Sequence, residues 1–367
     1  MPLFRRTKRW LIPITGLLLF SVLFAACGGS SPTILNTHGP VAAQETFLFW
    51  VILVISTVIF LGVEGVLIFN IVRFRERPGM EAPKQIHGNT AVEIAWTAAP
   101  AVVLLIVLVF TVRGVLAVAP ESQPTTGNTI NVTAIGHQWW WEFYYPDYNI
   151  TTADSMVIPV NTTIHVNLYS NNVIHSFWVP ALTGKTDLIP GHNNTKWFIA
   201  NDPGTYQGIC AEFCGTQHAN MRFDVVAESS DAFNTWAINA KQAAATPAPG
   251  TAAAQGEAIF KEQCATCHGI VGVTPKYQMQ DSSKVCTTTQ ACLLGPDLTH
   301  FGSRHLIAGG VLSWDAQSCQ PSPDLMTKCN IAKWLHDPQA IKPGNDMNVN
   351  LTQDQITQLV AYLLTLK

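Results

Sequence analysis

The chain has 367 residues, of which 48% are hydrophobic and only 12% are charged. This composition predicts membrane segments in a protein of two or three domains. The net charge of −3 argues against a nucleic-acid partner, because phosphate binding requires clustered Lys and Arg. Nine cysteines in an exported protein predict that most of them bind a metal, a cofactor or one another.

Residues 1–27 are predicted to be an export signal. A basic stretch from Arg5 to Arg9 precedes an apolar stretch from Leu11 to Phe24, and small residues then lead to Cys27. The end of this segment is similar to a bacterial lipoprotein cleavage site, at which Cys27 would carry lipid, although Phe24 stands where that motif usually has Leu. The alternative is an uncleaved third membrane helix, or cleavage elsewhere.

Residues 28–121 are predicted to form a transmembrane helical hairpin. Two apolar runs, about 47–72 and 94–119, are each long enough to cross a hydrocarbon core of ~30 Å at ~1.5 Å per residue. The loop between them is basic and contains Arg73, Arg75, Arg77 and Lys84. The flanking segments 28–45 and 114–184 contain no Lys or Arg. The positive-inside rule therefore places the loop in the cytoplasm and both ends of the hairpin outside.

Two carboxylates belong to this hairpin. Glu64 falls inside the first apolar run, where an ionisable group is costly and should face protein or water. Glu93 opens the second run, where the helix dipole favours a negative charge. For both residues a structural and a functional role remain open at this stage.

Residues 122–240 change to a β pattern. Short runs rich in Val, Ile, Thr and aromatic residues, such as 130–135, 163–169 and 196–200, are separated by Asn, Asp, Pro and Gly. Such runs predict an all-β sandwich or barrel. The segment 136–146 is unusually aromatic, and a buried core or interface cluster is the simplest explanation for it.

One loop of this β region concentrates soft metal ligands. Cys210, Cys214, His218 and Met221 lie within twelve residues, and His175 lies upstream. Sulfur and imidazole ligands suit copper, and a second thiolate exceeds what one blue-copper ion needs, so we predict two bridged coppers. A Cys₂His₂ zinc site and a Cys210–Cys214 disulfide are the alternatives, but neither explains Met221. A cupredoxin-like Greek-key barrel fits both the strands and the ligands.

Residues 241–254 are rich in Ala, Pro and Thr and are predicted to be a linker. The domain at 255–367 carries Cys264, Cys267 and His268 in the C-x-x-C-H pattern of haem c attachment. A thioredoxin-like pair is the alternative, but it requires a βαβ context. A second axial ligand is expected downstream, for which Met347 is favoured over the weaker candidates Met326 and Met279. Helical spacing over 352–366 predicts a closing helix.

The loop from Cys210 to Met221 resembles the binuclear copper (CuA) loop of cytochrome c oxidase subunit II. The resemblance implies that both cysteines bridge two copper ions and that each histidine binds one of them. It also implies that the Met221 sulfur binds one copper, that the Glu212 carbonyl oxygen binds the other, and that the Glu212 side chain binds Mg²⁺ at a subunit interface. One carboxylate is a thin site for a hard metal, so a partner must supply further ligands.

The resemblance extends over the hairpin, the copper domain and an all-α class I cytochrome c domain, and Lys342 to Met347 resemble the Lys-Pro-Gly-x-x-Met haem loop, with Asn348 in place of the usual Pro. The whole chain is similar to subunit II with fused cytochrome c in bacterial caa3-type haem-copper oxidases. Trp139 matches the residue that receives the electron, with Trp140 second. Glu93 matches a carboxylate at the entrance to a proton channel of the partner subunit.

The implied function is electron entry into a respiratory terminal oxidase in the bacterial plasma membrane, with copper and haem on the outer face. A haem-copper subunit I would reduce oxygen to water and pump protons, and other oxidase subunits would be partners. The external donor would be a cytochrome, a cupredoxin or a quinol:acceptor complex. A nitric oxide reductase subunit and a membrane-tethered copper or electron carrier are the alternatives.

Four cysteines lie outside both motifs: Cys286, Cys292, Cys319 and Cys329. Outside the cytoplasm disulfides are the default, and four cysteines allow three connectivities. The pairs 286–292 and 319–329 are favoured, because each would close a local insertion in the cytochrome domain.

Overall fold

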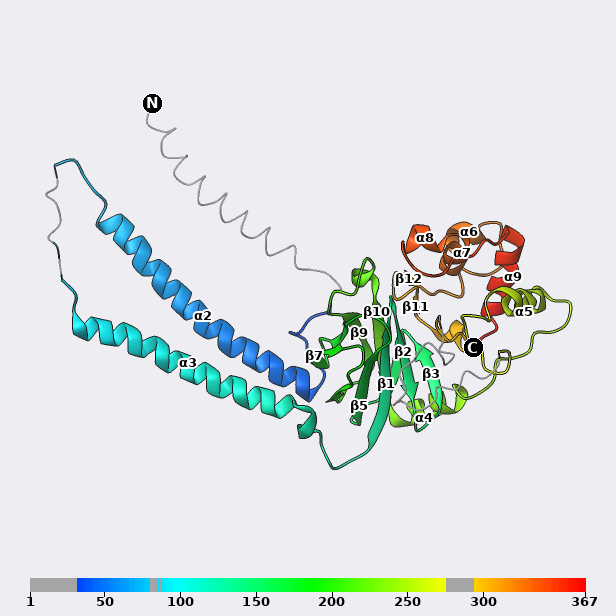
Figure 1. Cartoon of the computed structure of the whole chain (residues 1–367), viewed down its shortest axis with the longest axis horizontal. Helices are drawn as coiled ribbons and strands as arrows, with labels where there is room; N and C mark the ends of the chain where they lie inside the picture. The colour runs from blue at the N-terminus through cyan, green and yellow to red at the C-terminus, as the bar shows by residue number, and fades with distance from the viewer. Residues whose placement is uncertain (1–31, 80–84, 86, 275–293) are drawn as a thin grey trace, which may run out of the picture. The chain divides into compact units, whose positions relative to one another are not determined.

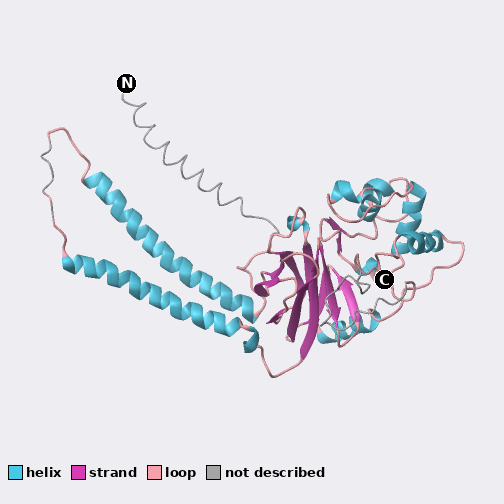
Figure 2. Cartoon of the chain, viewed as in Figure 1, coloured by secondary structure: helices cyan, strands magenta, loops and turns pink. Residues whose placement is uncertain are grey.

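The computed structural model describes residues 32–79, 85, 87–274 and 294–367. A helical hairpin is followed by a domain of strands and then by a mainly helical domain (Figures 1 and 2). Residues Ile34–Lys367 form one compact unit. The predicted export signal with Cys27 lies outside the described residues.

The hairpin consists of α2 (Pro40–Arg73) and α3 (Thr90–Val118), which lie close together at their ends beside the β domain and diverge toward their other ends (Figure 1). Both helices are long and apolar enough to cross a membrane. The rings of Phe47 and Phe110 meet edge to face at 5.9 Å between the two helices. Apolar side chains that are exposed in the isolated chain cover most of both helices, as expected for surfaces that face lipid or a partner.

Both helices begin earlier than the apolar runs predict, because local capping and packing extend them. Gly39 is the N-cap of α2 and Pro40 occupies its first turn, a position that suits proline. Ala42 is buried there and its N–H donates to the carbonyl of Leu182 in the next domain. At α3 the Asn89 side chain caps the first N–H groups.

The β domain contains two five-stranded sheets. The first has the order β3-β2-β1-β5-β8 and the second β4-β10-β9-β6-β7. Their bounds are β1 Thr129–His137, β2 Trp140–Tyr145, β3 Ile150–Ala153, β4 Ser155–Pro159, β5 Thr163–Ser170, β6 His175–Val179, β7 Thr183–Leu188, β8 Asn194–Phe198, β9 Gly204–Cys210 and β10 Arg222–Glu228. The pairs β1–β5 and β4–β10 are parallel and the others are antiparallel, so the chain crosses between sheets, as in a cupredoxin-like barrel.

The core of this domain lies between the two sheets. Trp141 and Phe143 from β2 contact Phe223 from β10 with ring centroids 5.0 and 5.4 Å apart, and Phe177 from β6 lies 4.9 Å from Phe223. All four rings are completely buried. Such aromatic pairs contribute about 0.5–1.5 kcal/mol each beyond the area they bury, so the aromatic segment predicted from sequence does form core.

Short 3₁₀ turns connect several elements of the chain: η1 Pro120–Ser122, η2 His218–Asn220 and η3 Phe301–Ser303. The helices after the β domain are α4 Ser230–Asn239, α5 Ala252–Gln263, α6 Leu325–Lys328, α7 Asn330–His336, α8 Pro338–Ile341 and α9 Gln353–Leu363. Helix α5 begins inside the predicted linker, because Thr251 caps it. Helix α9 starts with a capping box at Thr352.

The predicted cytochrome domain is mainly helical, as expected, and contains in addition one short ribbon, β11 (Leu306–Ile307) paired with β12 (Leu312–Ser313). Helices α5 and α9 pack closely, with the rings of Phe260 and Tyr362 5.9 Å apart. The predicted disulfide between Cys319 and Cys329 is present. The other predicted pair, Cys286 and Cys292, and the weaker haem-ligand candidate Met279 lie outside the described residues.

Candidate copper and haem sites

The predicted copper ligands come from one end of the second sheet. His175 opens β6, Cys210 ends β9, Cys214 lies in the loop after it, and His218 opens η2. Met221 directly precedes β10. Because β6 and β9 are hydrogen-bonded neighbours, the fold brings His175 to a loop that lies 35 residues further along the chain.

The structure brings all six predicted donor groups together. The two cysteine sulfur atoms are 3.8 Å apart, so the alternative of a disulfide between them is not present. Short distances join the remaining donors to this sulfur pair: His175 Nδ1 to Cys210 Sγ 3.9 Å, Glu212 O to Cys210 Sγ 3.3 Å, His218 Nδ1 to Cys214 Sγ 3.7 Å, and Met221 Sδ to Cys214 Sγ 3.8 Å.

The surroundings prepare these groups for metal binding. The hydrogen bond between the two thiol groups lowers the pKa of Cys210 and raises the pKa of Cys214. The Asn172 Oδ1 atom lies 3.0 Å from His175 Nε2, and by accepting a hydrogen bond there it leaves Nδ1 free toward the sulfur atoms.

The donor set fits copper better than the zinc alternative. Two thiolates, two imidazoles, a thioether and a carbonyl exceed the four ligands of a structural zinc site. Sulfur and imidazole ligands are those preferred by copper. One histidine nitrogen lies within 4 Å of each sulfur atom, so each thiolate has an imidazole with which it could share a metal ion. Burial of His175, Cys210, Cys214 and Met221 shields the site from water.

Trp139 contacts the copper loop directly. Its indole N–H donates to the Cys214 carbonyl at 2.9 Å, and the Gln138 amide donates to the same oxygen at 2.7 Å. Trp140, the second candidate for electron entry, instead stacks on His137 at a centroid distance of 4.1 Å. Of the two tryptophans, Trp139 is the one whose indole is bonded to the copper loop.

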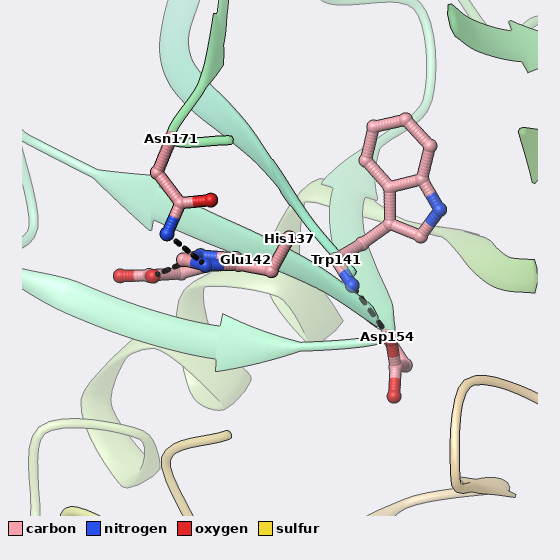
Figure 3. Close-up of polar contacts among 5 residues, drawn as sticks. All are labelled: His137, Trp141, Glu142, Asp154 and Asn171. Atoms are coloured by element: carbon pink, nitrogen blue, oxygen red, sulfur yellow. Dashed lines mark hydrogen bonds and ion pairs between the residues drawn. The ribbon is translucent and has the colours of Figure 1, made fainter. Parts of the chain in front are cut away.

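A buried polar cluster supports the strands next to this loop (Figure 3). His137 Nε2 lies 3.0 Å from Glu142 Oε2, and the Asn171 amide nitrogen lies 2.8 Å from His137 Nδ1. Because the amide donates to Nδ1, the neutral imidazole carries its proton on Nε2 and donates it to Glu142. Nearby, the Trp141 N–H donates to Asp154 at 2.9 Å.

The haem motif lies between α5 and a loop that contains Pro296. His268 Nδ1 is 2.8 Å from the Pro296 carbonyl oxygen, a bond that fixes the tautomer and leaves Nε2 for a metal. Burial lowers the pKa of His268, which favours the neutral, ligating form. A Cβ atom at Gly295 would lie 2.6 Å from the His268 ring, so the close approach of this loop requires glycine.

Two candidates for the second axial ligand, Met347 and Met326, lie within the described residues. Met347 and Met326 are both half-buried and pack against the hydrophobic core of the cytochrome domain, as does Cys264. The Met347 N–H donates to the Asn345 side chain at 2.8 Å, and the Gln339 amide donates to the Met347 carbonyl at 3.3 Å. These bonds fix the backbone of the predicted haem loop.

The remaining predicted side chains are three carboxylates. Glu93 is exposed in the first turn of α3, Glu64 lies within α2, and the Glu212 side chain is half-buried on the copper loop. Sequence reasoning missed Asn172 and Gln138, because neither belongs to a ligand motif. Proximity in sequence to His175 and Trp139 is the one signal that could have found them.

The chain matches three family models. Residues 149–230 match the periplasmic domain of cytochrome c oxidase subunit II, residues 34–113 its transmembrane domain, and residues 253–367 cytochrome c. The first and third families imply copper and haem c. The two apolar helices and the periplasmic match fit a membrane protein with a domain on the outer face.

Two relatives match this chain over nearly the whole of their own length. Cytochrome c oxidase subunit 2 of Alkalihalophilus pseudofirmus is 34% identical over 100% of this chain and 99% of its own length. The subunit 2 of Bacillus sp. (strain PS3) is 33% identical over 95% of each chain. The crystal structure of the periplasmic domain of subunit II of cytochrome oxidase from Bradyrhizobium japonicum is 32% identical, with a TM-score of 0.31, and covers 32% of this chain and 97% of that one. The chain belongs to the cytochrome c oxidase subunit II family, in the form that carries a cytochrome c domain, and is a subunit of an oxidoreductase complex.

Proposed function

We propose that this chain is the electron-entry subunit of a respiratory terminal oxidase. Electrons from an external donor enter at the cytochrome domain, cross to the copper domain and leave for subunit I, where oxygen is reduced and protons are pumped. The observation that supports the proposal is that His175 of β6 and five predicted copper donors of the loop 210–221 lie together, and that the Cys214 carbonyl of this loop accepts the Trp139 N–H at 2.9 Å. This bond joins a large aromatic side chain to a predicted copper ligand.

Each cofactor has residues that suit it. Cys264 and Cys267 would attach haem c, with His268 and Met347 as axial ligands. His175, Cys210, Glu212, Cys214, His218 and Met221 would hold two copper ions. When bound, both groups supply one-electron redox chemistry. The chain itself fixes the donors, excludes water from the buried thiolates and holds Trp139 against the copper loop.

Two carboxylates extend the proposal toward the partner subunit. Glu212 offers its carbonyl oxygen to copper, and its half-buried carboxylate remains available for Mg²⁺, with further ligands supplied by subunit I. Glu93 lies exposed at the outset of α3, next to the basic cytoplasmic loop. That position suits a group that delivers protons to a channel of the partner subunit from the cytoplasmic side.

An EPR spectrum of the full chain, loaded with copper and oxidised, tests the copper assignment. We expect hyperfine structure from one unpaired electron shared equally between two copper nuclei. A single-copper spectrum, or bound zinc without a signal, would overturn the assignment. Isolation together with a haem-copper oxygen reductase would support the oxidase role, whereas a nitric oxide reductase partner or a stable lone chain would favour the two alternatives.

A further inference from the structure

Lys342 belongs to the cytochrome domain but is buried against the copper domain. Only 3% of the Lys342 surface is exposed. The ammonium group donates to the carbonyl oxygens of Trp139 at 2.7 Å, Asn220 at 2.8 Å and Ala308 at 2.7 Å. Three N–H donors thus meet three acceptors. Two acceptors come from the copper domain and the third from the cytochrome domain, so one side chain joins both domains.

Further hydrogen bonds join the copper domain to the cytochrome domain around Lys342. The Gln217 amide, on the copper loop, donates to the Pro343 carbonyl at 2.8 Å, and the Arg222 N–H donates to the Gly309 carbonyl at 2.8 Å. Hydrogen bonds to a buried charge are among the stronger ones in proteins. Because these bonds surround Lys342, the interface has a defined geometry centred on this residue.

The close approach also depends on two glycines of the cytochrome domain with positive φ. Gly309 has φ +67°, and a Cβ atom there would lie 2.6 Å from Lys342 Nζ and 2.7 Å from the Trp139 carbonyl oxygen. Gly344 has φ +84°, and its Cβ atom would lie 3.3 Å from Thr216 Oγ1 on the copper loop. Both positions favour glycine, so the backbone of the cytochrome domain is shaped to fit the copper domain at this point.

The covered surface is the one next to Trp139. A Cβ atom at Gly344 would also lie 3.8 Å from the edge of the Trp139 ring, and the Trp139 carbonyl is bonded to Lys342. An external protein that needed this surface would have to displace the loop from Lys342 to Gly344.

Burial lowers the pKa of Lys342 to about 8, so the amine remains mainly protonated at pH 7.

We propose that Lys342 latches the cytochrome domain onto the copper domain over Trp139, so that the chain's own cytochrome domain closes this surface to external electron-transfer proteins. An external donor must therefore deliver its electron to the cytochrome domain. Lys342 is a positioning residue, because it touches backbone carbonyls rather than copper or haem. This inference rests on the proposed function, since it assumes that electrons pass between the two domains.

The test uses the full chain in the assembled oxidase with Lys342→Met, Gly309→Ala and, as a matched control, Lys328→Met. Lys328 belongs to the same domain but is exposed and pairs with Asp324 at 2.8 Å. Gly309→Ala disturbs the latch without removing the lysine. The first readout is acetylation of lysines by an amine-reactive reagent, followed by mass spectrometry. We expect Lys342 in the parent to react at least about tenfold more slowly than Lys328, and Gly309→Ala to remove that protection.

The second readout is electron transfer, followed separately at haem and copper after mixing with reduced soluble cytochrome c. In the parent and in Lys328→Met, haem reduction should precede copper reduction. In Lys342→Met and Gly309→Ala, transfer from haem to copper should slow by at least about tenfold. Direct reduction of copper by the added protein should then appear.

The latch is overturned if Lys342 in the parent reacts as fast as Lys328, or if both latch variants transfer electrons as the parent does. Lysine reactivity in the parent decides the question even where a variant fails to fold. Failure of the proposed function looks different, because the parent itself would then lack the two-copper spectrum or would pass no electron from haem to copper.

Discussion

Replacing Gly136 with alanine is expected to abolish normal copper binding, although Gly136 is not a ligand. Gly136 lies in β1, and a Cβ atom there would be 2.7 Å from Cδ2 and 2.9 Å from Cγ of His175. Ordinary contacts begin at 3.4 Å, so the imidazole would have to move by about 0.7 Å. Metal–ligand distances tolerate shifts of only about 0.2 Å. His175 is completely buried, and the Trp141 ring lies against it, so little space is available for that movement.

The assay measures copper per chain and the EPR spectrum of the loaded protein, together with thermal unfolding. Overpacking of this kind costs about 1–3 kcal/mol, so the domain should still fold while copper content or the two-copper spectrum is lost. Gly204→Ala is the matched control in the same domain, because its nearest neighbour, Tyr206, would lie 3.5 Å from the new Cβ atom. Two coppers and an unchanged spectrum in Gly136→Ala would refute the proposed position of His175 as a ligand.

Three further predictions concern other parts of the chain. Replacing Cys319 and Cys329 together by alanine should lower the stability of the cytochrome domain by about 2–3 kcal/mol, measured by denaturant unfolding, because the bridge closes a loop of separation 10. Glu142→Leu should lower the unfolding temperature and cost about 1–3 kcal/mol, because the buried His137 N–H loses its acceptor. Met347→Leu should lower the haem reduction potential in a redox titration, because a methionine axial ligand raises it.

Each of these three predictions would be contradicted by a specific result. Unchanged denaturant unfolding of the double variant would mean that the disulfide does not constrain the unfolded cytochrome domain. Full stability of Glu142→Leu would show that the His137 N–H finds another acceptor. An unchanged potential in Met347→Leu, combined with a lowered one in Met326→Leu, would transfer the axial role to Met326.

Most of the candidate copper site could be predicted from the sequence because its proposed ligands are local. Cys210, Cys214, His218 and Met221 lie on one loop, and their chemistry identifies copper before any fold is known. His175 was found by its residue type and by family resemblance, and its proximity depends on the pairing of β6 with β9. The starts of α2 and α3 were missed because hydropathy detects a membrane span but not the capping and packing that lengthen a helix.

The contacts between the domains could not be predicted, because they join residues far apart in sequence through backbone atoms. Lys342 bonds to a carbonyl 203 positions earlier in the chain, and a carbonyl group carries no sequence signal. Gly309 appears in the sequence only as one of 25 glycines. Its role depends on a positive φ and on the atoms that a side chain would meet.

Trp139 contacts both the copper loop and the cytochrome domain. Its indole N–H is bonded to the carbonyl of Cys214, and its own carbonyl is bonded to Lys342 of the cytochrome domain. A shift of the cytochrome domain would therefore pull on the backbone of a residue whose side chain is tied to a copper-ligand loop. Because both bonds are short and partly buried, we expect the position of the cytochrome domain to affect the geometry of the copper loop. Domain docking and copper-site geometry should therefore change together in Lys342→Met, whereas simple tethering by a linker would leave the copper spectrum untouched.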